Sequence, residues 1–257
     1  MANRARRNLL WLGGIALAYL ALARGPGLVR RAFPPAFPFQ DIPGLPGFRR
    51  IARGDVTAAP PLLIGLDPDA PRAPGPGLDA LRADPCTALF GGAQGGGPVP
   101  VAYFSDVRCP WCRVLTPLLL DRAGGAAPAI RLAWHPLPLL GETSVIAARA
   151  AIAAEAQGAG AAVHARLSGT RLVPTPAALR RLAGETGIDP DRLLADMTAP
   201  RVDDRLAVSR GLADLFGFPG TPALVIGRTA VLGRIAAADL DRLIALEASE
   251  AATAPCA

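Results

Sequence analysis

Two cysteines separated by two residues give the sequence its clearest chemical signal. Cys109 and Cys112 enclose Pro110 and Trp111, and they lie between a strand-like run at residues 99–104 and a helix-like run. A Cys-X-X-Cys pair in that setting is typical of a thioredoxin-type redox site. Only a thiolate attacks a disulfide, and a helix N-terminus stabilises its negative charge. We therefore expect Cys109 to be the attacking sulfur and Cys112, one helical turn further on, to be the resolving sulfur.

The composition indicates a folded protein without a nucleic-acid partner. The chain has 257 residues, of which 51% are hydrophobic, and this length allows one or two domains with a sizeable core. All the basic residues are arginine, and the net charge of +6 is spread along the chain. No basic helix and no aromatic-interleaved basic patch stands out, so binding to nucleic acid is not expected.

Residues 1–29 have the pattern of an export signal. Three arginines among the first seven residues precede an uncharged, apolar run at residues 9–23 that ends in Ala-Leu-Ala. That order is typical of a secretory signal peptide. The run is shorter than the about 20 apolar residues that span a bilayer, but residues 25–29 would extend it. We expect either a signal peptide or a membrane anchor within residues 9–29. The body would be periplasmic in either case, soluble after cleavage or anchored to the inner membrane.

Export determines how the other two cysteines are interpreted, because disulfides persist outside the cytosol. Cys86 precedes the Cys-X-X-Cys region, and Cys256 is the penultimate residue. One alternative is a structural disulfide that closes a long loop, which would stabilise the fold by about 2–5 kcal/mol. The other is a pair of unpaired thiols, with Cys256 on a frayed tail.

Residues 30–98 are dense in proline and glycine. This composition is incompatible with long helices, so we expect a stalk or a loosely packed lead-in. Residues 61–65 are a candidate short strand, and residues 78–83 are a candidate short helix.

The compact region is expected to begin at residue 99 and to continue to residue 257. Its predicted elements are strands and helices in alternation: a strand at 99–104, a helix at 109–122, a strand at 129–135, a helical block at about 143–216, a hairpin of 223–226 with 229–232, and a helix at 236–246. Within the block, Thr143-Ser144, Thr175-Pro176 and Asp189-Pro190 are predicted helix starts.

This order predicts an α/β protein with a thioredoxin fold and an inserted helical domain. Over residues 99–247 the chain resembles the DsbA family of exported thiol-disulfide oxidoreductases. The resemblance rests on three motifs, at residues 103–112, at residues 136–141 followed by Ser144, and at residues 218–227.

The resemblance implies roles for several residues around the cysteines. Pro222 would be a cis proline facing the motif, and Thr221 would offer an open backbone edge to an extended substrate segment. Trp111 stands where the best-known family member has histidine, and it would either contact substrate or pack within the motif. Arg108 would either lower the pKa of Cys109 or be a solvated surface residue.

Tyr103 departs from the family pattern, and this departure affects what is expected of Asp106. Tyr103 stands at the strand position where DsbA-like proteins often carry glutamate, so the proton path to Cys112 is in doubt. Asp106 is expected to cap the helix instead.

We expect the function to be disulfide exchange with exported cysteine-containing proteins, in the oxidising direction and without a cofactor. In this family a membrane quinone-linked partner usually reoxidises the enzyme. The alternatives are a reductase or isomerase for cytochrome or copper-centre assembly, and a metal-carrying binding module. His135 and His164 are the two histidines, and neither forms a pair with ligand spacing, so no metal site is expected.

Overall fold

The computed structural model describes most of the chain: residues 35–52, 54–58, 77–92, 97–170, 172–251 and 256. The contacts divide the chain into residues 1–38 and 39–257, and the helices and strands given below belong to the second part. The expected export segment at residues 1–29 and the candidate strand at residues 61–65 lie outside the described residues. Among the residues that are described, no helix is long and apolar enough to cross a membrane.

A six-stranded mixed sheet in the order β1-β2-β8-β7-β4-β5 forms the centre of residues 39–257. Its strands are β1 (Gln40–Asp41), β2 (Arg49–Ala52), β4 (Val99–Ser105), β5 (Ile130–Pro136), β7 (Ala223–Ile226) and β8 (Thr229–Leu232). Strand β4 pairs in parallel with β5 and antiparallel with β7, and β7 forms a hairpin with β8. The predicted strand pair and hairpin are confirmed. A parallel pair needs a crossover connection, which the helix that carries the cysteines supplies.

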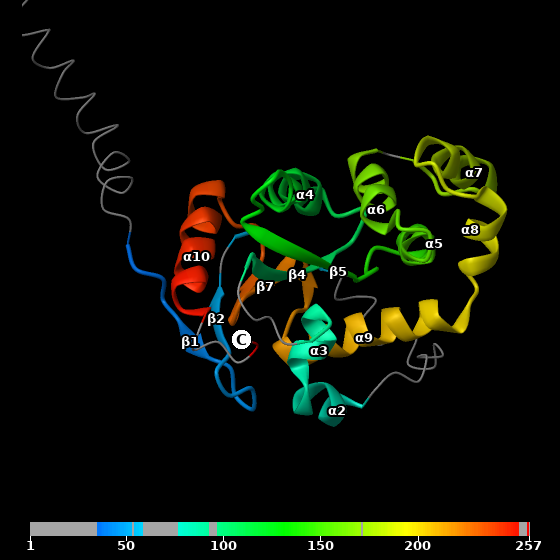
Figure 1. Ribbon diagram of the computed structural model, residues 1–257. Coiled ribbons are helices and arrows are strands. Elements are labelled where there is room, and N and C mark those ends of the chain that lie inside the picture. The colour runs from blue at the N-terminus through cyan, green and yellow to red at the C-terminus, as the bar shows by residue number, and fades with distance from the viewer. Residues whose placement is uncertain are drawn as a thin grey trace, which may run out of the picture. The chain divides into compact units, whose positions relative to one another are not determined.

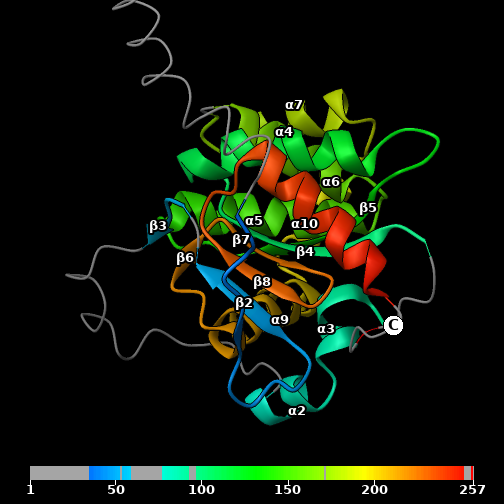
Figure 2. The same ribbon diagram turned by 90° about the vertical axis from the view of Figure 1, so that its left-hand side faces the viewer.

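Helices cover both faces of this sheet. On one face lie α4 (Pro110–Ala123) and α10 (Ala237–Ser249), and α9 (Pro200–Phe216) lies on the other (Figure 2). The chain between β5 and α9 forms four helices at the β5 side of the sheet (Figure 1): α5 (Glu142–Glu155), α6 (Gly160–Gly169), α7 (Pro176–Glu185) and α8 (Pro190–Asp196). The predicted fold, a thioredoxin fold with a helical insertion, is confirmed.

Two of the three predicted helix starts in the insertion are confirmed. Thr175 caps α7 by accepting a hydrogen bond from the Ala178 amide, and Asp189 caps α8 in the same way. The prediction that Thr143-Ser144 caps α5 is wrong, because the N-cap is Gly141 and no side chain caps that end. Gly141 has a φ of +93°, a conformation that favours glycine.

The expectation of a stalk or loosely packed lead-in at residues 30–98 is wrong for its described parts. Strand β2 joins the main sheet by parallel pairing with β8, far along the chain. The predicted helix at residues 78–83 is present as α2 (Leu78–Ala83), and it packs with α3 (Pro85–Phe90) against α9. Glycine and proline prevent long helices, but they do not prevent short elements from packing on distant ones.

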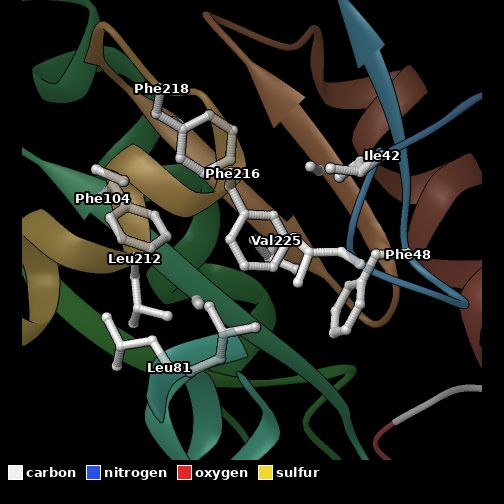
Figure 3. Close-up of a cluster of buried hydrophobic side chains, with 14 of the residues drawn as sticks. Ile42, Phe48, Leu81, Phe104, Leu212, Phe216, Phe218 and Val225 are labelled. Atoms are coloured by element: carbon white, nitrogen blue, oxygen red, sulfur yellow. The ribbon is translucent and has the colours of Figure 1, made fainter. Parts of the chain in front are cut away.

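Apolar side chains of the lead-in complete the core on the α9 face of the sheet. Phe48 and Leu81 are 2% and 4% exposed, and they belong to one cluster with Leu212 and Phe216 of α9 (Figure 3). The rings of Phe48 and Phe216 meet edge to face with their centres 5.3 Å apart. Burying such side chains contributes about 1.5–3 kcal/mol each to folding. The described parts of the lead-in are therefore an integral part of the domain.

Two further links attach the lead-in to the C-terminal half. The carboxylate of Glu247 on α10 is buried, and it accepts hydrogen bonds from Arg49 Nη2 at 2.7 Å and from Thr229 Oγ1 at 2.6 Å. A buried charge of this kind needs such partners. A disulfide joins Cys86 to Cys256, with Cα atoms 5.3 Å apart across 170 positions of sequence. Cys256 is 4% exposed, so its side chain is buried and is not part of a frayed tail.

Candidate active site

The cysteine pair lies at the junction of β4 and α4. Strand β4 ends at Ser105, and Cys109 is the N-cap of α4, with Pro110 at the first helical position. Proline is well suited there because its fixed φ matches the helix and its missing N–H would have no helical partner. The amide of Cys112 donates a hydrogen bond to Cys109 Sγ at 3.3 Å. The sulfur of Cys109 thus lies at the positive end of the helix dipole.

Both thiols are free and enclosed. Cys109 is 1% exposed and Cys112 is fully buried. On the side away from α4, Cys109 Sγ lies 3.4 Å from the carbonyl oxygen of Thr221 and 3.5 Å from Oγ1 of Thr57. As a thiol, Cys109 can donate to either oxygen. Once it is ionised, the Thr57 hydroxyl can turn and donate to the sulfur, whereas the Thr221 carbonyl cannot, because it has no proton.

The surroundings of Cys109 favour its thiolate. Hydrogen bonding by the Cys112 thiol is the largest effect, and together with the side chains of Thr221 and Thr57 and the Cys112 amide it lowers the pKa of Cys109 from 9.0 to about 6. Burial acts in the opposite direction but is outweighed. At neutral pH most Cys109 is therefore thiolate, the form that attacks disulfides.

Cys112 has the opposite tendency. Burial, and then the neighbouring Cys109, raise the pKa of Cys112 well above its ordinary value of 9.0. The two sulfurs of one motif are thus distinguished, one as a stabilised anion and the other as a protonated thiol. This difference fits an attacking and a resolving role.

Tyr103 lies beneath the motif at the strand position noted above. Its hydroxyl donates to the carbonyl oxygen of Cys112 at 3.3 Å and is 3.1 Å from Thr116 Oγ1. Burial raises the pKa of Tyr103 well above its ordinary value of 10.0, so the phenol stays neutral. Tyr103 therefore anchors the first turn of α4 and does not supply a buried base.

Asp106 does not cap α4, contrary to expectation, because Cys109 occupies the cap position. The buried carboxylate of Asp106 instead accepts hydrogen bonds from four groups, one on the loop before the motif and three on the chain that follows β5. These donors are the amides of Arg108, Leu139 and Leu140 and the hydroxyl of Ser144. Asp106 thereby holds the loop before Cys109 against the loop that leads into α5.

Arg108 and Trp111 lie on the outer side of the motif. The Arg108 side chain is exposed, and within the described part of the chain it makes no hydrogen bond or ion pair. Arg108 is not among the groups that shift the pKa of Cys109. The guanidinium of Arg234 lies over the ring of Trp111, 5.3 Å from its centre. This cation–π contact fixes one face of the half-buried indole.

The peptide bond between Thr221 and Pro222 is cis, as the resemblance implied, and both residues are buried beside Cys109. The backbone edge at Thr221 is not open, however. Strand β3 (Thr57–Ala58) pairs antiparallel with β6 (Gly220–Thr221), with Thr57 opposite Thr221. Sequence analysis missed this pairing because a two-residue strand in a segment rich in proline, glycine and alanine leaves no periodic signal.

The hydrogen bonds of the two histidines involve residues other than the cysteines. His135 hydrogen-bonds the Leu89 carbonyl, and His164 lies 2.9 Å from Ser105 Oγ. Burial lowers the pKa of His135 to about 4 and that of His164 to about 3, so both are neutral at pH 7. No group of three or more histidine, cysteine or acidic side chains suited to a metal occurs among the described residues.

A thioredoxin fold with a thiolate-stabilised Cys-X-X-Cys helix start defines a thiol-disulfide oxidoreductase. The sequence of residues 100–245 matches the DSBA-like thioredoxin domain, and the chain belongs to this family. A thioredoxin-like oxidoreductase from Silicibacter pomeroyi has 34% sequence identity and a TM-score of 0.55, with 65% of this chain and 98% of that chain covered.

Two other solved structures share the fold. A periplasmic thioredoxin-like protein from Salmonella enterica serovar Typhimurium has 26% identity and a TM-score of 0.54, covering 63% of this chain and 95% of that chain. The thiol-disulfide exchange protein alpha-DsbA2 from Wolbachia pipientis has 18% identity and a TM-score of 0.57, covering 66% and 95%.

One curated relative is of a different kind. The chain is 33% identical over 135 residues to the Na(+)/H(+) antiporter NhaA 3 of Salinispora tropica, and this match covers 50% of the chain but 20% of the antiporter. The match thus covers about a fifth of the length of that protein, and the name antiporter refers to its full length.

Proposed function

We propose that this protein exchanges disulfides with cysteine-containing proteins outside the cytoplasm, and that Cys109 is the sulfur that exchanges. The observation that supports this most strongly is the contrast between the two thiols. Cys109 has a pKa of about 6 at a helix N-terminus, whereas the pKa of Cys112 is raised above 9.0. A low-pKa thiolate is also a good leaving group from a mixed disulfide.

In the oxidising direction, a substrate thiolate attacks Cys109 of the Cys109–Cys112 disulfide. The bond between the two enzyme sulfurs breaks, and Cys112 leaves and takes up a proton. A second substrate thiolate then attacks the substrate sulfur of the mixed disulfide and expels Cys109 as a thiolate. Two electrons pass from the substrate dithiol to the enzyme, and we propose a membrane quinone-linked partner as their acceptor.

The same contrast supports the oxidising direction that we propose. Interactions that stabilise the Cys109 thiolate stabilise the reduced enzyme, which makes its disulfide a stronger oxidant. Periplasmic export is supported by the apolar run at residues 9–23 and by the Cys86–Cys256 disulfide, which suits an oxidising compartment. The Salmonella structure described as periplasmic has the same fold.

Trapping the intermediate tests this function. Purified Cys112→Ala should accumulate a mixed disulfide at Cys109 when it is given a disulfide-linked peptide, because the resolving thiol is gone. Cys109→Ala should form none, and the oxidised parent should introduce a disulfide into a reduced dithiol peptide. Exchange by Cys109→Ala at the parent rate would contradict the assignment, and reduction without oxidation would contradict the direction.

A further inference from the structure

Residues 54–58, termed here the strap, occupy the backbone edge beside the reactive sulfur. Their strand β3 lies next to β6, and together they form a two-stranded sheet separate from the main one (Figure 2). Thr57 stands opposite Thr221 in an antiparallel register. We propose that the strap is an internal stand-in for substrate, and that an extended substrate segment docks by displacing it. This inference rests on the exchange function proposed above.

The enclosure of Cys109 requires something to move. An incoming sulfur must contact Cys109 Sγ, yet this residue is 1% exposed. Among the described residues, the hydrogen-bonding groups that lie against that sulfur come from Cys112, Thr221 and Thr57. Cys112 and Thr221 are fully buried parts of the domain core, whereas Thr57 is half-buried on a strand of two residues. The strap is therefore the element that can yield.

Within the described part of the chain, the attachments of the strap are few and exposed to water. Besides the pairing with β6, the Arg234 amide donates to the Asp55 carbonyl at 3.0 Å. The side chains of these two residues form an ion pair of 3.8 Å between groups that are 44% and 57% exposed. Such a pair contributes little, because water screens it. Val56 is 38% exposed and leaves the strap with little apolar anchoring. Segments of this kind open locally without global unfolding.

An extended polypeptide can replace what the strap provides. It offers the same backbone donors and acceptors to Gly220 and Thr221, and its cysteine sulfur would take the place of the Thr57 hydroxyl at Cys109. A small disulfide offers no such backbone pairing, so it gains nothing from opening the strap. The apparent affinity for any substrate equals its affinity for the open form multiplied by the fraction of open strap. Only a polypeptide offsets this loss through backbone pairing, so unfolded chains bind better than small thiol compounds.

Amide hydrogen exchange on a trapped complex tests the displacement. Cys112→Ala of the full chain is linked through Cys109 to a cysteine peptide, and exchange is compared with and without the peptide. We expect the amides of residues 55–58 to lose protection at least ten-fold in the complex, while residues 49–52 of β2 stay unchanged. Unchanged protection at residues 55–58 would overturn the displacement. Failure to form any mixed disulfide would instead overturn the exchange function on which it rests.

A matched pair of valine substitutions tests the same idea by kinetics. Val56→Gly should loosen the strap by adding backbone freedom, and Val173→Gly makes the same change at a valine 63% exposed in the loop before α7. At pH 8, where Cys109 stays ionised, attack on a peptide disulfide should be about two- to five-fold faster in Val56→Gly and unchanged in Val173→Gly. Equal rates in the two variants would overturn the proposal.

Discussion

The hydroxyl oxygen of Thr57 lies 3.5 Å from Sγ of Cys109, although 52 positions separate the two residues in sequence. The contact brings a residue of the lead-in to the reactive sulfur. Because the hydroxyl can donate to a thiolate, it favours the charged form of Cys109 and contributes to its lowered pKa.

Removing this hydroxyl should make Cys109 a weaker acid. We expect Thr57→Val, which keeps the shape of the side chain, to raise the pKa of Cys109 from about 6 by about one pH unit, the effect of one hydrogen bond to a charged group. Thr57→Ser keeps a hydroxyl and should stay near the parent value. Thiolate absorbance followed against pH gives these values. Equal titration of the parent and Thr57→Val would show that the hydroxyl does not act on the sulfur.

The reduction potential should depend on pH with a change of slope. Below pH 6 the reduced enzyme holds both thiol protons, and above pH 6 it holds the Cys112 proton alone. The potential should therefore fall by about 59 mV per pH unit below this point and by about 30 mV above it. Equilibration with glutathione or dithiothreitol between pH 4.5 and 8 measures both slopes. One constant slope of about 59 mV would place the pKa of Cys109 outside this range.

The packing of the lead-in predicts a stability effect far from the cysteines. Phe48→Ala empties a site 2% exposed against Phe216 and should destabilise the protein by about 3–5 kcal/mol. Val173→Ala, at a position 63% exposed, should change stability by less than about 0.5 kcal/mol. Urea unfolding of both variants makes the comparison. A Phe48→Ala variant as stable as the parent would mean that the lead-in is not part of the core.

Local signals explain which elements could be predicted from sequence. The turn at Gly227-Arg228, the prolines after Thr175 and Asp189, and the apolar run of β4 each define an element within a few residues. The redox site could be predicted for the same reason, because its two cysteines lie within four consecutive residues. Each of these features is encoded in neighbouring residues, so no knowledge of distant parts was needed.

The parts that sequence did not predict depend on distant partners. Strand β2 begins with Arg49-Arg50, and its burial depends on pairing with β8 and on the buried Glu247. Thr57 becomes part of the site through its pairing with Thr221. Asp106 was expected to act on its own helix, but three of its four partners lie on the segment after β5. Contacts of such sequence separation leave no periodic or motif signal.

Alkylation of the reduced protein at graded pH, with the modified residue identified by mass spectrometry, tests the central assignment most directly. The account predicts that Cys109 reacts first, with half-maximal rate near pH 6, and that Cys112 stays unmodified in the folded protein up to pH 9. Closure of the strap slows the reaction of Cys109 but does not change which sulfur ionises. Modification of Cys112 before Cys109, or of both with a midpoint near pH 9, would contradict the roles assigned to the two sulfurs.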